Sequence, residues 1–166
     1  MTMTVTAGGV ALQAASAQAA TASTTTTTAK PAKVTRSAKA AKAARQKARA
    51  GKAVAVAKKQ LGDPYRYGAT GPGSFDCSGL VQYAWRKAGV KIPRVTNSQY
   101  ARIRTKVSWG NLRPGDLMFF HGKGHVGMYV GNGKMIHSPS SGKTVRIEKL
   151  SGWRKSSFAG AVRPGA

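Results

Sequence analysis

The stretch Ser74-Phe75-Asp76-Cys77-Ser78-Gly79-Leu80 decides the fold, because it contains the only cysteine of the chain and precedes a helical pattern. Apolar residues recur after it at helical spacing, the last turn of the pattern is basic, and Gly89 can end the helix in the left-handed conformation. Cys77 is therefore predicted to lie in the first turn of a helix, where unpaired N–H groups and the helix dipole favour an anion. There the pKa of a thiol, ordinarily about 8.5, can fall toward the range that forms a thiolate.

A buried structural cysteine is the alternative interpretation, since free cysteines are among the most buried side chains. The neighbours of Cys77 are small or polar, namely Asp76, Ser78 and Gly79. Such neighbours fit an accessible turn better than a core. A nucleophilic thiol also needs a basic partner, and the second half of the chain supplies candidates.

The composition describes a strongly basic chain of 166 residues, with 28 Lys and Arg against four acids and a net charge of +24. The length allows one domain with a core and an extension. Four scattered carboxylates do not suit a glycosidase, which needs a facing pair. One cysteine allows no disulfide framework and no Cys-rich zinc site, and no run of about 18 apolar residues predicts a membrane span.

The N-terminal residues 1–29 carry no charge and include a run of threonines. An apolar stretch followed by Ala17-Gln18-Ala19 resembles the later part of a secretory signal with its small-residue cleavage site. Its basic beginning is missing, so a low-complexity segment is the alternative. We favour a signal that lacks its start, and expect a secreted protein.

Residues 30–50 are rich in alanine and lysine and are predicted to form a basic helical linker. Lys42, Arg45, Arg49 and Lys52 share one helical face. The segment is either a solvated linker or an electrostatic tether to an anionic polymer. Gly51 is expected to interrupt the helix, so the folded domain is predicted to span residues 51–166.

Short segments with strand patterns fill the second half of the chain, separated by turns rich in glycine, proline and asparagine. They are residues 116–120, 126–130, 134–137, 144–148 and 160–163. Helices come before them, one of which is expected to begin at Thr96 with a capping box completed by Gln99. Helices followed by a small antiparallel sheet predict an α+β fold.

All three histidines belong to this sheet region. His125 begins one expected strand and His137 ends the next, so an antiparallel pair can place them side by side, with His137 orienting His125. His121 is interpreted as a non-catalytic strand-end residue and Asp116 as a turn residue. A zinc site is disfavoured because the His-x3-His spacing crosses a flexible glycine loop, so no metal or other cofactor is expected.

Several motifs together resemble one family, the NlpC-type bacterial cell-wall cysteine peptidases, over roughly Gly51 to Arg163. Several motifs in the family's order are far more specific than any one of them alone. They are Asp76-Cys77-Ser78-Gly79-Leu80-Val81, Leu112-Arg113-Pro114-Gly115-Asp116-Leu117, His125-Val126-Gly127-Met128-Tyr129-Val130-Gly131 and Met135-Ile136-His137.

The resemblance implies a papain-like fold and hydrolysis of the bond between γ-D-glutamate and the diamino acid of peptidoglycan stem peptides. It implies that Cys77 is the nucleophile, His125 the base and His137 the orienting residue. The backbone N–H of Cys77 and the hydroxyl of Tyr65 would hold the oxyanion. Substrate-binding positions implied in this way are Tyr65, Asp76, Ser78, Arg94 and Thr96.

The expected partners are peptidoglycan stem peptides and, through the basic arm, anionic wall polymers. We expect a monomer associated with the cell wall, without a membrane span and without nucleic acid. One alternative is an acyltransferase or amidase on the same thiol fold, because a fold does not determine the acceptor. Another is a non-enzymatic polyanion-binding protein, which the charge alone supports.

Overall fold

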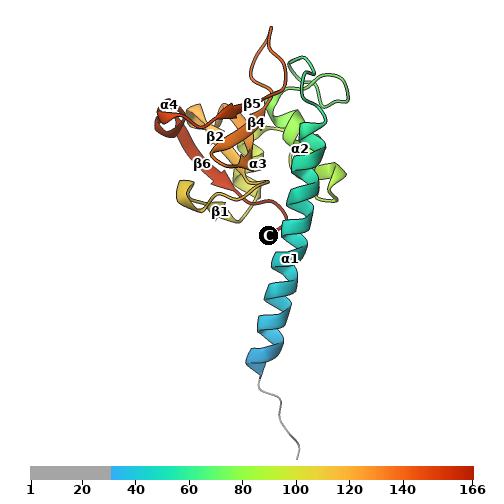
Figure 1. Cartoon of the computed structure of the whole chain (residues 1–166), viewed down its shortest axis with the longest axis vertical. Coiled ribbons are helices and arrows are strands. Elements are labelled where there is room, and N and C mark those ends of the chain that lie inside the picture. Colours follow the sequence, from blue (N-terminus) through green and yellow to red (C-terminus); the bar gives the residue numbers. More distant parts are fainter. Residues whose placement is uncertain (1–30) are drawn as a thin grey trace, which may run out of the picture.

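The computed structural model describes residues 31–166, with side chains described from Thr35 onward. The expected signal segment at residues 1–29 lies outside the described residues. Four helices, two 3-10 turns and six strands follow one another in the order drawn in Figure 1. The helices and turns are α1 (Pro31–Lys58), α2 (Cys77–Lys87), α3 (Thr96–Arg102), η1 (Trp109–Asn111), η2 (His121–Lys123) and α4 (Gly152–Ser156).

The six strands form one sheet with the order β1-β6-β2-β3-β4-β5, in which every neighbouring pair is antiparallel. Their bounds are β1 (Lys106–Val107), β2 (Leu117–Phe120), β3 (His125–Gly131), β4 (Lys134–His137), β5 (Arg146–Lys149) and β6 (Phe158–Val162). The predicted α+β arrangement is confirmed. The five expected strands are present within two residues at each end, whereas the two-residue β1 and the short α4 carry no pattern that predicts them.

Helix α1 runs without a break through Gly51, so the expected interruption at that glycine is wrong. Its C-terminal part buries Ala50, Ala53, Val54 and Ala57 in the core. Packing of this apolar face outweighs the cost of one glycine in a helix, which is only about 1 kcal/mol. The division of the chain into regions at residue 51 stays a prediction.

The main core lies between α1, α2 and one face of the sheet, and Figure 1 shows the two helices side by side. Trp85 of α2 is fully buried, and its indole Nε1 donates a hydrogen bond to the carbonyl oxygen of Gly115 at 3.3 Å. Leu80 and Val81, next to Cys77 in the chain, are also fully buried. The start of α2 is thereby fixed against the sheet.

No helix within residues 31–166 combines the length and apolarity needed to cross a bilayer.

The start of α3 differs from its expected form. Val95 is the N-cap and no side chain caps the helix, so the predicted capping box of Thr96 and Gln99 is wrong. Gln99 instead is fully buried, and its Nε2 donates to the carbonyl oxygens of Ser78 and Pro93. The amide of Gln99 therefore ties α3 to the first turn of α2.

Candidate active site

Asp76 is the N-cap of α2, and Cys77 is the first residue of that helix, as predicted. The carboxylate of Asp76 accepts a hydrogen bond of 2.7 Å from the backbone N–H of Gly79 and one of 3.0 Å from Gly68. Gly79 has no side chain at a point where a Cβ would lie 2.1 Å from the carbonyl oxygen of Ala69. Cap and glycine together join the loop before Cys77 to the helix that carries it.

Arg94 completes this cluster by binding both Asp76 and Ser78. Its two terminal nitrogens donate to the two carboxylate oxygens of Asp76, and Nη1 also donates to the hydroxyl of Ser78 at 2.7 Å. Burial acts to raise the pKa of Asp76, but the hydrogen bonds from Arg94 and from Gly79 N–H outweigh it and hold that pKa below its ordinary value. Asp76 is thus a carboxylate near neutral pH.

The thiol of Cys77 is half-buried and unpaired. Burial raises its pKa, and the negative charge of Asp76 adds to the effect, although hydrogen bonding from the backbone N–H groups of Val126 and Ser78 acts in the opposite direction. The expected fall of the thiol pKa is therefore wrong, since desolvation exceeds the effect of the helix start. The contact with the N–H of Val126, the residue that follows His125 in the chain, places the sulfur at the beginning of β3.

His125 and His137 lie diagonally across β3 and β4, on the same face of the sheet. Gly127 faces His137 in the register that pairs Met128 with Ile136, and His125 is two residues before Gly127. The Nε2 of His125 lies 2.8 Å from the Nδ1 of His137. The predicted approach of the two rings is confirmed.

Glu148 on β5 extends this pair, because its Oε2 lies 3.1 Å from the Nε2 of His137. Its other oxygen accepts a 2.9 Å hydrogen bond from the Nε of Arg154. Although burial acts to raise the pKa of Glu148, the hydrogen bond and charge of Arg154 hold it below its ordinary value. An ionised carboxylate only accepts hydrogen bonds, so Glu148 requires a proton on the Nε2 of His137.

The tautomers of both rings follow from that requirement. Burial lowers the pKa of His137 and of His125, so both rings are neutral and each carries one proton. His137 has its proton on Nε2 and accepts through Nδ1, so His125 must donate from its own Nε2. The Nδ1 of His125 is left without a proton and can act as a base.

The remaining predicted site residues surround this centre to different degrees. The pKa of Tyr65 is raised, first by burial and then by the charges that Cys77 and Asp76 carry when ionised, so both groups lie within electrostatic reach of its hydroxyl. Thr96 begins α3, and its side chain makes no hydrogen bond to another of the described residues. The structure therefore gathers Tyr65, Asp76, Ser78 and Arg94 around Cys77, and leaves Thr96 outside their hydrogen-bond network.

Asp116 and His121 were predicted to be a turn residue and a non-catalytic strand-end residue, and both lie outside the hydrogen bonds of the histidine pair. Asp116 is fully buried and accepts from the backbone N–H of Arg113 within its turn, and also from the guanidinium of Arg163 at 2.7 Å. His121 is exposed and follows directly after β2. Neither contacts the His125–His137 pair by hydrogen bonding.

Sequence reasoning missed Glu148 and Arg154. Glu148 was counted only as one of four scattered acids, and its position depends on the register that pairs His137 with Arg146 across β4 and β5. That register places Glu148 on the same face as His137, at the diagonal position. The available signal was an acid at the end of an expected strand, one turn after the strand that ends in His137. Such a pattern is too common to identify a site.

Comparison with known proteins agrees with this geometry. A model of the NlpC/P60 family matches residues 62–162. Probable endopeptidase p60 of Listeria monocytogenes is 46% identical over 107 residues, which cover 61% of this chain and 22% of that protein. Murein DD-endopeptidase MepH of Escherichia coli is 44% identical over 117 residues, or 63% of this chain and 43% of MepH. The chain thus spans less than half the length of these two relatives.

Solved structures give the same result. A NlpC/P60 family protein from Bacillus cereus has a TM-score of 0.64 at 38% identity, covering 69% of this chain and 39% of its own. The P60 domain of an antigen from M. avium subspecies paratuberculosis has a TM-score of 0.63 at 28% identity, covering 71% of this chain and 96% of that domain. Since the family model covers more than half of the sequence, including Cys77, His125 and His137, the chain belongs to the NlpC/P60 family.

Proposed function

We propose that this protein is a peptidoglycan endopeptidase that hydrolyses an amide bond of cell-wall stem peptides with Cys77 as nucleophile. The observation that carries the proposal is the ordered chain from Glu148 through His137 to His125, together with the hydrogen bond from the N–H of Val126, the residue after His125, to the Cys77 thiol. The neutral imidazole of His125 has one unprotonated nitrogen, so it can accept the proton of the neutral Cys77 thiol during attack. The endopeptidase names of two relatives support the same class of reaction.

In the proposed reaction the Nδ1 of His125 takes the proton of the Cys77 thiol while sulfur bonds to the carbonyl carbon. The tetrahedral oxyanion is held by the backbone N–H of Cys77 and the hydroxyl of Tyr65. His125 then gives its proton to the leaving amine as the C–N bond breaks. Water, deprotonated by His125, hydrolyses the resulting thioester and restores the thiol.

His137 has the role of a positioning residue in this scheme. Its hydrogen bond with His125 fixes the ring, and the charge of Glu148 stabilises the imidazolium that forms during attack. Asp76, Ser78, Arg94 and Thr96 are proposed to line the substrate cleft on the acyl side. The mutual hydrogen bonds of Asp76, Ser78 and Arg94 make that wall rigid, which favours an ordered substrate.

Two bonds are candidates for cleavage. The resemblance of the motifs favours the bond between γ-D-glutamate and the diamino acid, whereas the name of the MepH relative refers to a DD cross-link. Purified peptidoglycan digested with the protein and analysed by mass spectrometry separates them, because the first releases stem-peptide fragments and the second opens cross-linked dimers. Cys77→Ala should abolish either product. Undiminished release by Cys77→Ala would refute the thiol mechanism.

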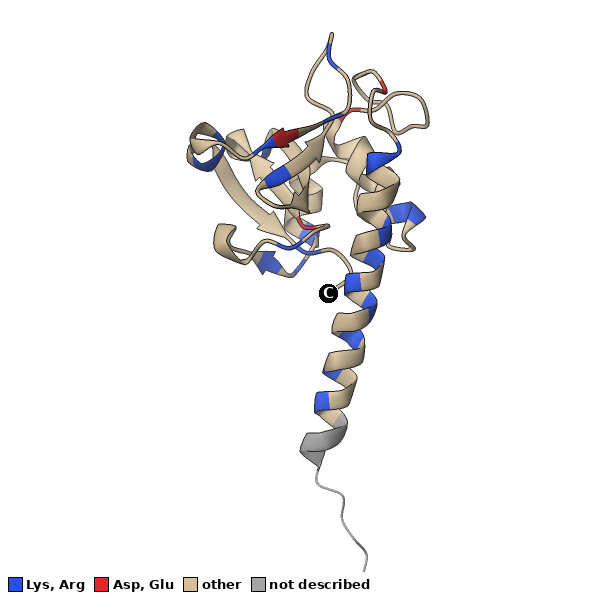
Figure 2. Ribbon diagram, viewed as in Figure 1, with Lys and Arg blue, Asp and Glu red and all other residues tan. Residues whose placement is uncertain are grey.

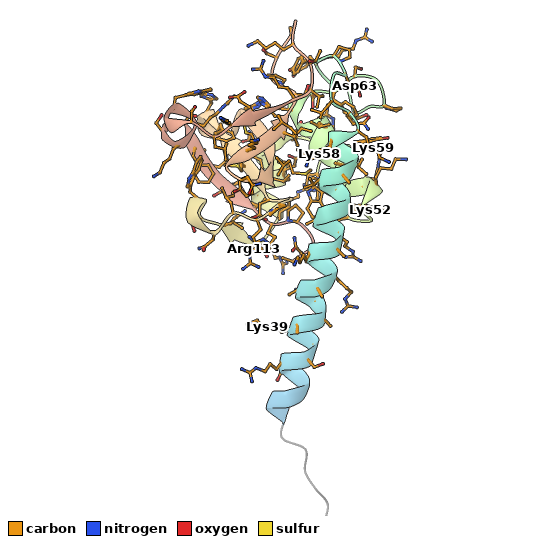
Figure 3. All side chains as sticks on the ribbon, viewed as in Figure 1. Lys39, Lys52, Lys58, Lys59, Asp63 and Arg113 are labelled. Atoms are coloured by element: carbon orange, nitrogen blue, oxygen red, sulfur yellow. The ribbon has the colours of Figure 1, made fainter. Side chains whose placement is uncertain are left out.

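We also propose that the protein is secreted and that basic side chains of α1 hold it on anionic polymers of the cell wall. Lys and Arg follow one another along α1 in Figure 2, and no acid occurs between Lys30 and Lys59. A groove of about 780 Å³ separates α1 from the Arg113–Pro114 turn and the C-terminus, and its basic side chains include Lys39 and Arg113, both labelled in Figure 3. A phosphate-bearing chain is a suitable ligand for such a groove.

Substitution tests this anchoring better than deletion. Gln46 of α1 donates a hydrogen bond to the carbonyl oxygen of Pro164, so removal of the helix would disturb the folded part. A Lys39→Gln/Lys42→Gln/Lys47→Gln variant should sediment less with purified walls that retain their phosphate polymers. On walls stripped of those polymers it should equal the wild type. If the variant and the wild type sediment equally with both preparations, the anchoring role is refuted.

A further inference from the structure

A second cavity, of about 530 Å³, adjoins the histidine pair. His125 and His137 form part of its wall, and Tyr65, Asp76, Cys77, Ser78 and Arg94 are not among the residues that line it. It therefore shares His125 with the active site but none of the residues proposed to form the acyl cleft. Its other walls come from the loop after β4, from β5 and from α4.

The walls of this cavity carry an unbalanced positive charge. Lys143, Arg146 and Arg154 line it with Glu148 as the one carboxylate. His125 and His137 are neutral, and the three cations outnumber the one carboxylate by two. In water-filled clefts such an arrangement attracts small anionic groups.

The three cations are engaged to different degrees. Arg154 is 7% exposed, pairs with Glu148 at 2.9 Å and stacks on Trp153 with its guanidinium 4.0 Å from the ring centre. Arg146 makes only a 3.4 Å contact with Glu148 and is 45% exposed. Among the described residues, Lys143 is in none of the ion pairs. Lys143 and Arg146 are therefore the groups able to bind an added anion.

An aromatic wall faces these cations. Trp153 is 52% exposed, which is unusual for the largest apolar side chain, and the ring of His121 lies 6.0 Å from it. Because Arg154 stacks on one side of the indole and is itself fixed by Glu148, the platform is held in place. The cavity thus combines a fixed apolar surface with exposed positive groups, a combination suited to an amino acid that ends in a carboxylate.

The chemistry of the reaction tells which part of the substrate reaches this cavity. His125 must protonate the leaving amine, so the residue that carries this amine lies beside His125 when the bond breaks. For the first bond the carbon that bears the amine also bears a carboxyl group, which is free where the stem ends at that residue. For the second bond the same holds when the cross-linking residue is diaminopimelate. We propose that Lys143 and Arg146 bind the free carboxylate of the leaving residue, and that the enzyme therefore prefers acid over amide forms of its substrate. The inference rests on the proposed endopeptidase function.

The test compares substrates that differ only in one carboxyl group. For each candidate bond, a synthetic stem peptide is made with the carboxyl of the leaving residue as the free acid or as the carboxamide. For the first bond this is L-alanyl-γ-D-glutamyl-L-lysine, and for the second it is a dimer cross-linked through diaminopimelate. The values of kcat/KM are measured for the full chain, for Lys143→Gln/Arg146→Gln and for the control Lys149→Gln. Lys149 is also on β5, and it does not line the cavity.

The wild type and the control should cleave the acid about tenfold better than the amide, an effect of the size expected for two partly exposed charged contacts. The double variant should lose that preference because its rate on the acid falls while its rate on the amide is unchanged. Equal rates of the wild type on acid and amide, or an equal fall on both in the double variant, would overturn the inference and leave the endopeptidase intact. Cleavage of neither pair would refute the proposed function and the inference with it.

Discussion

The Nε2 of His137 lies 3.1 Å from the Oε2 of Glu148, and this contact determines where the protons are on two imidazole rings. An ionised carboxylate at this position forces His137 to accept from His125. Glu148 thus influences the base without contacting it or the substrate. In the proposed mechanism it is a positioning residue.

Replacement of Glu148 by Gln should reverse the tautomers. Arg154 donates to Oε1, so the amide oxygen of Gln will take that place and the amide NH2 will face His137. His137 must then accept through Nε2 and donate from Nδ1, which leaves the proton of His125 on the nitrogen that should act as base. We expect kcat on peptidoglycan fragments to fall about 100-fold or more with little change in KM.

The control for that variant is Asp63→Asn, which removes a carboxylate that has no ion pair among the described residues. It should retain the activity of the wild type. A Glu148→Gln protein with normal kcat and an unchanged pH profile would show that the contact has only a structural role.

The pKa shifts of the two buried histidines predict a loss of stability in acid. Both pKa values are lowered from 6.5, so as pH falls the unfolded chain binds protons before the folded protein does. The free energy of unfolding should therefore decrease below about pH 6.5, by at most about 1.4 kcal/mol per pH unit for each histidine. Urea denaturation at pH 7.0, 6.0 and 5.0 measures this slope.

A His125→Asn/His137→Asn variant should have a smaller slope over the same pH interval. The matched control is His121→Asn, which removes an exposed imidazole that is not part of the buried pair. If the double variant keeps the slope of the wild type, the buried pair is not its source.

The thiol of Cys77 should react with alkylating agents as a neutral thiol. Burial raises its pKa, and burial also lowers the pKa of His125, so the resting pair is uncharged. The rate of reaction with iodoacetamide should rise with pH to a midpoint above about 8.5. Because Cys77 is the only cysteine of the chain, the label reports on it alone. A rate already at its plateau between pH 6 and 8 would instead indicate a thiolate–imidazolium pair.

Two glycine substitutions should have opposite effects on stability. In Gly79→Ala the new Cβ would lie 2.1 Å from the carbonyl oxygen of Ala69, which is backbone and cannot easily move. Thermal denaturation should show a loss of about 1–3 kcal/mol. In Gly51→Ala the Cβ meets nothing within 4 Å on a helix, so that variant should gain about 0.5–1 kcal/mol. A stable Gly79→Ala protein would mean that the loop carrying Ala69 is free to shift.

Local patterns predicted the parts of the site that depend on neighbours in sequence. The first turn at Cys77 follows from helical spacing, and the proximity of His125 and His137 follows from two strands joined by a short turn. These elements need no knowledge of distant contacts. For the same reason the α+β class could be predicted from the order of patterns alone.

Features that depend on tertiary contacts were not predictable in this way. The continuity of α1 at Gly51 is due to the burial of Ala50 and Ala53, and the raised pKa of Cys77 is due to desolvation by burial. Glu148 reaches His137 only through the register of β4 and β5. In each case the deciding partner is far away in the sequence.

Helix α1 is one continuous helix of 28 residues. It packs in the core at one end and extends away from the domain at the other (Figure 1). At 1.5 Å per residue it measures about 42 Å. A polymer bound near Lys39 is consequently kept at a fixed distance and orientation relative to Cys77. A flexible linker would leave that distance variable. The helix would then act as a spacer that determines how far from the bound polymer the thiol can cleave the cell wall.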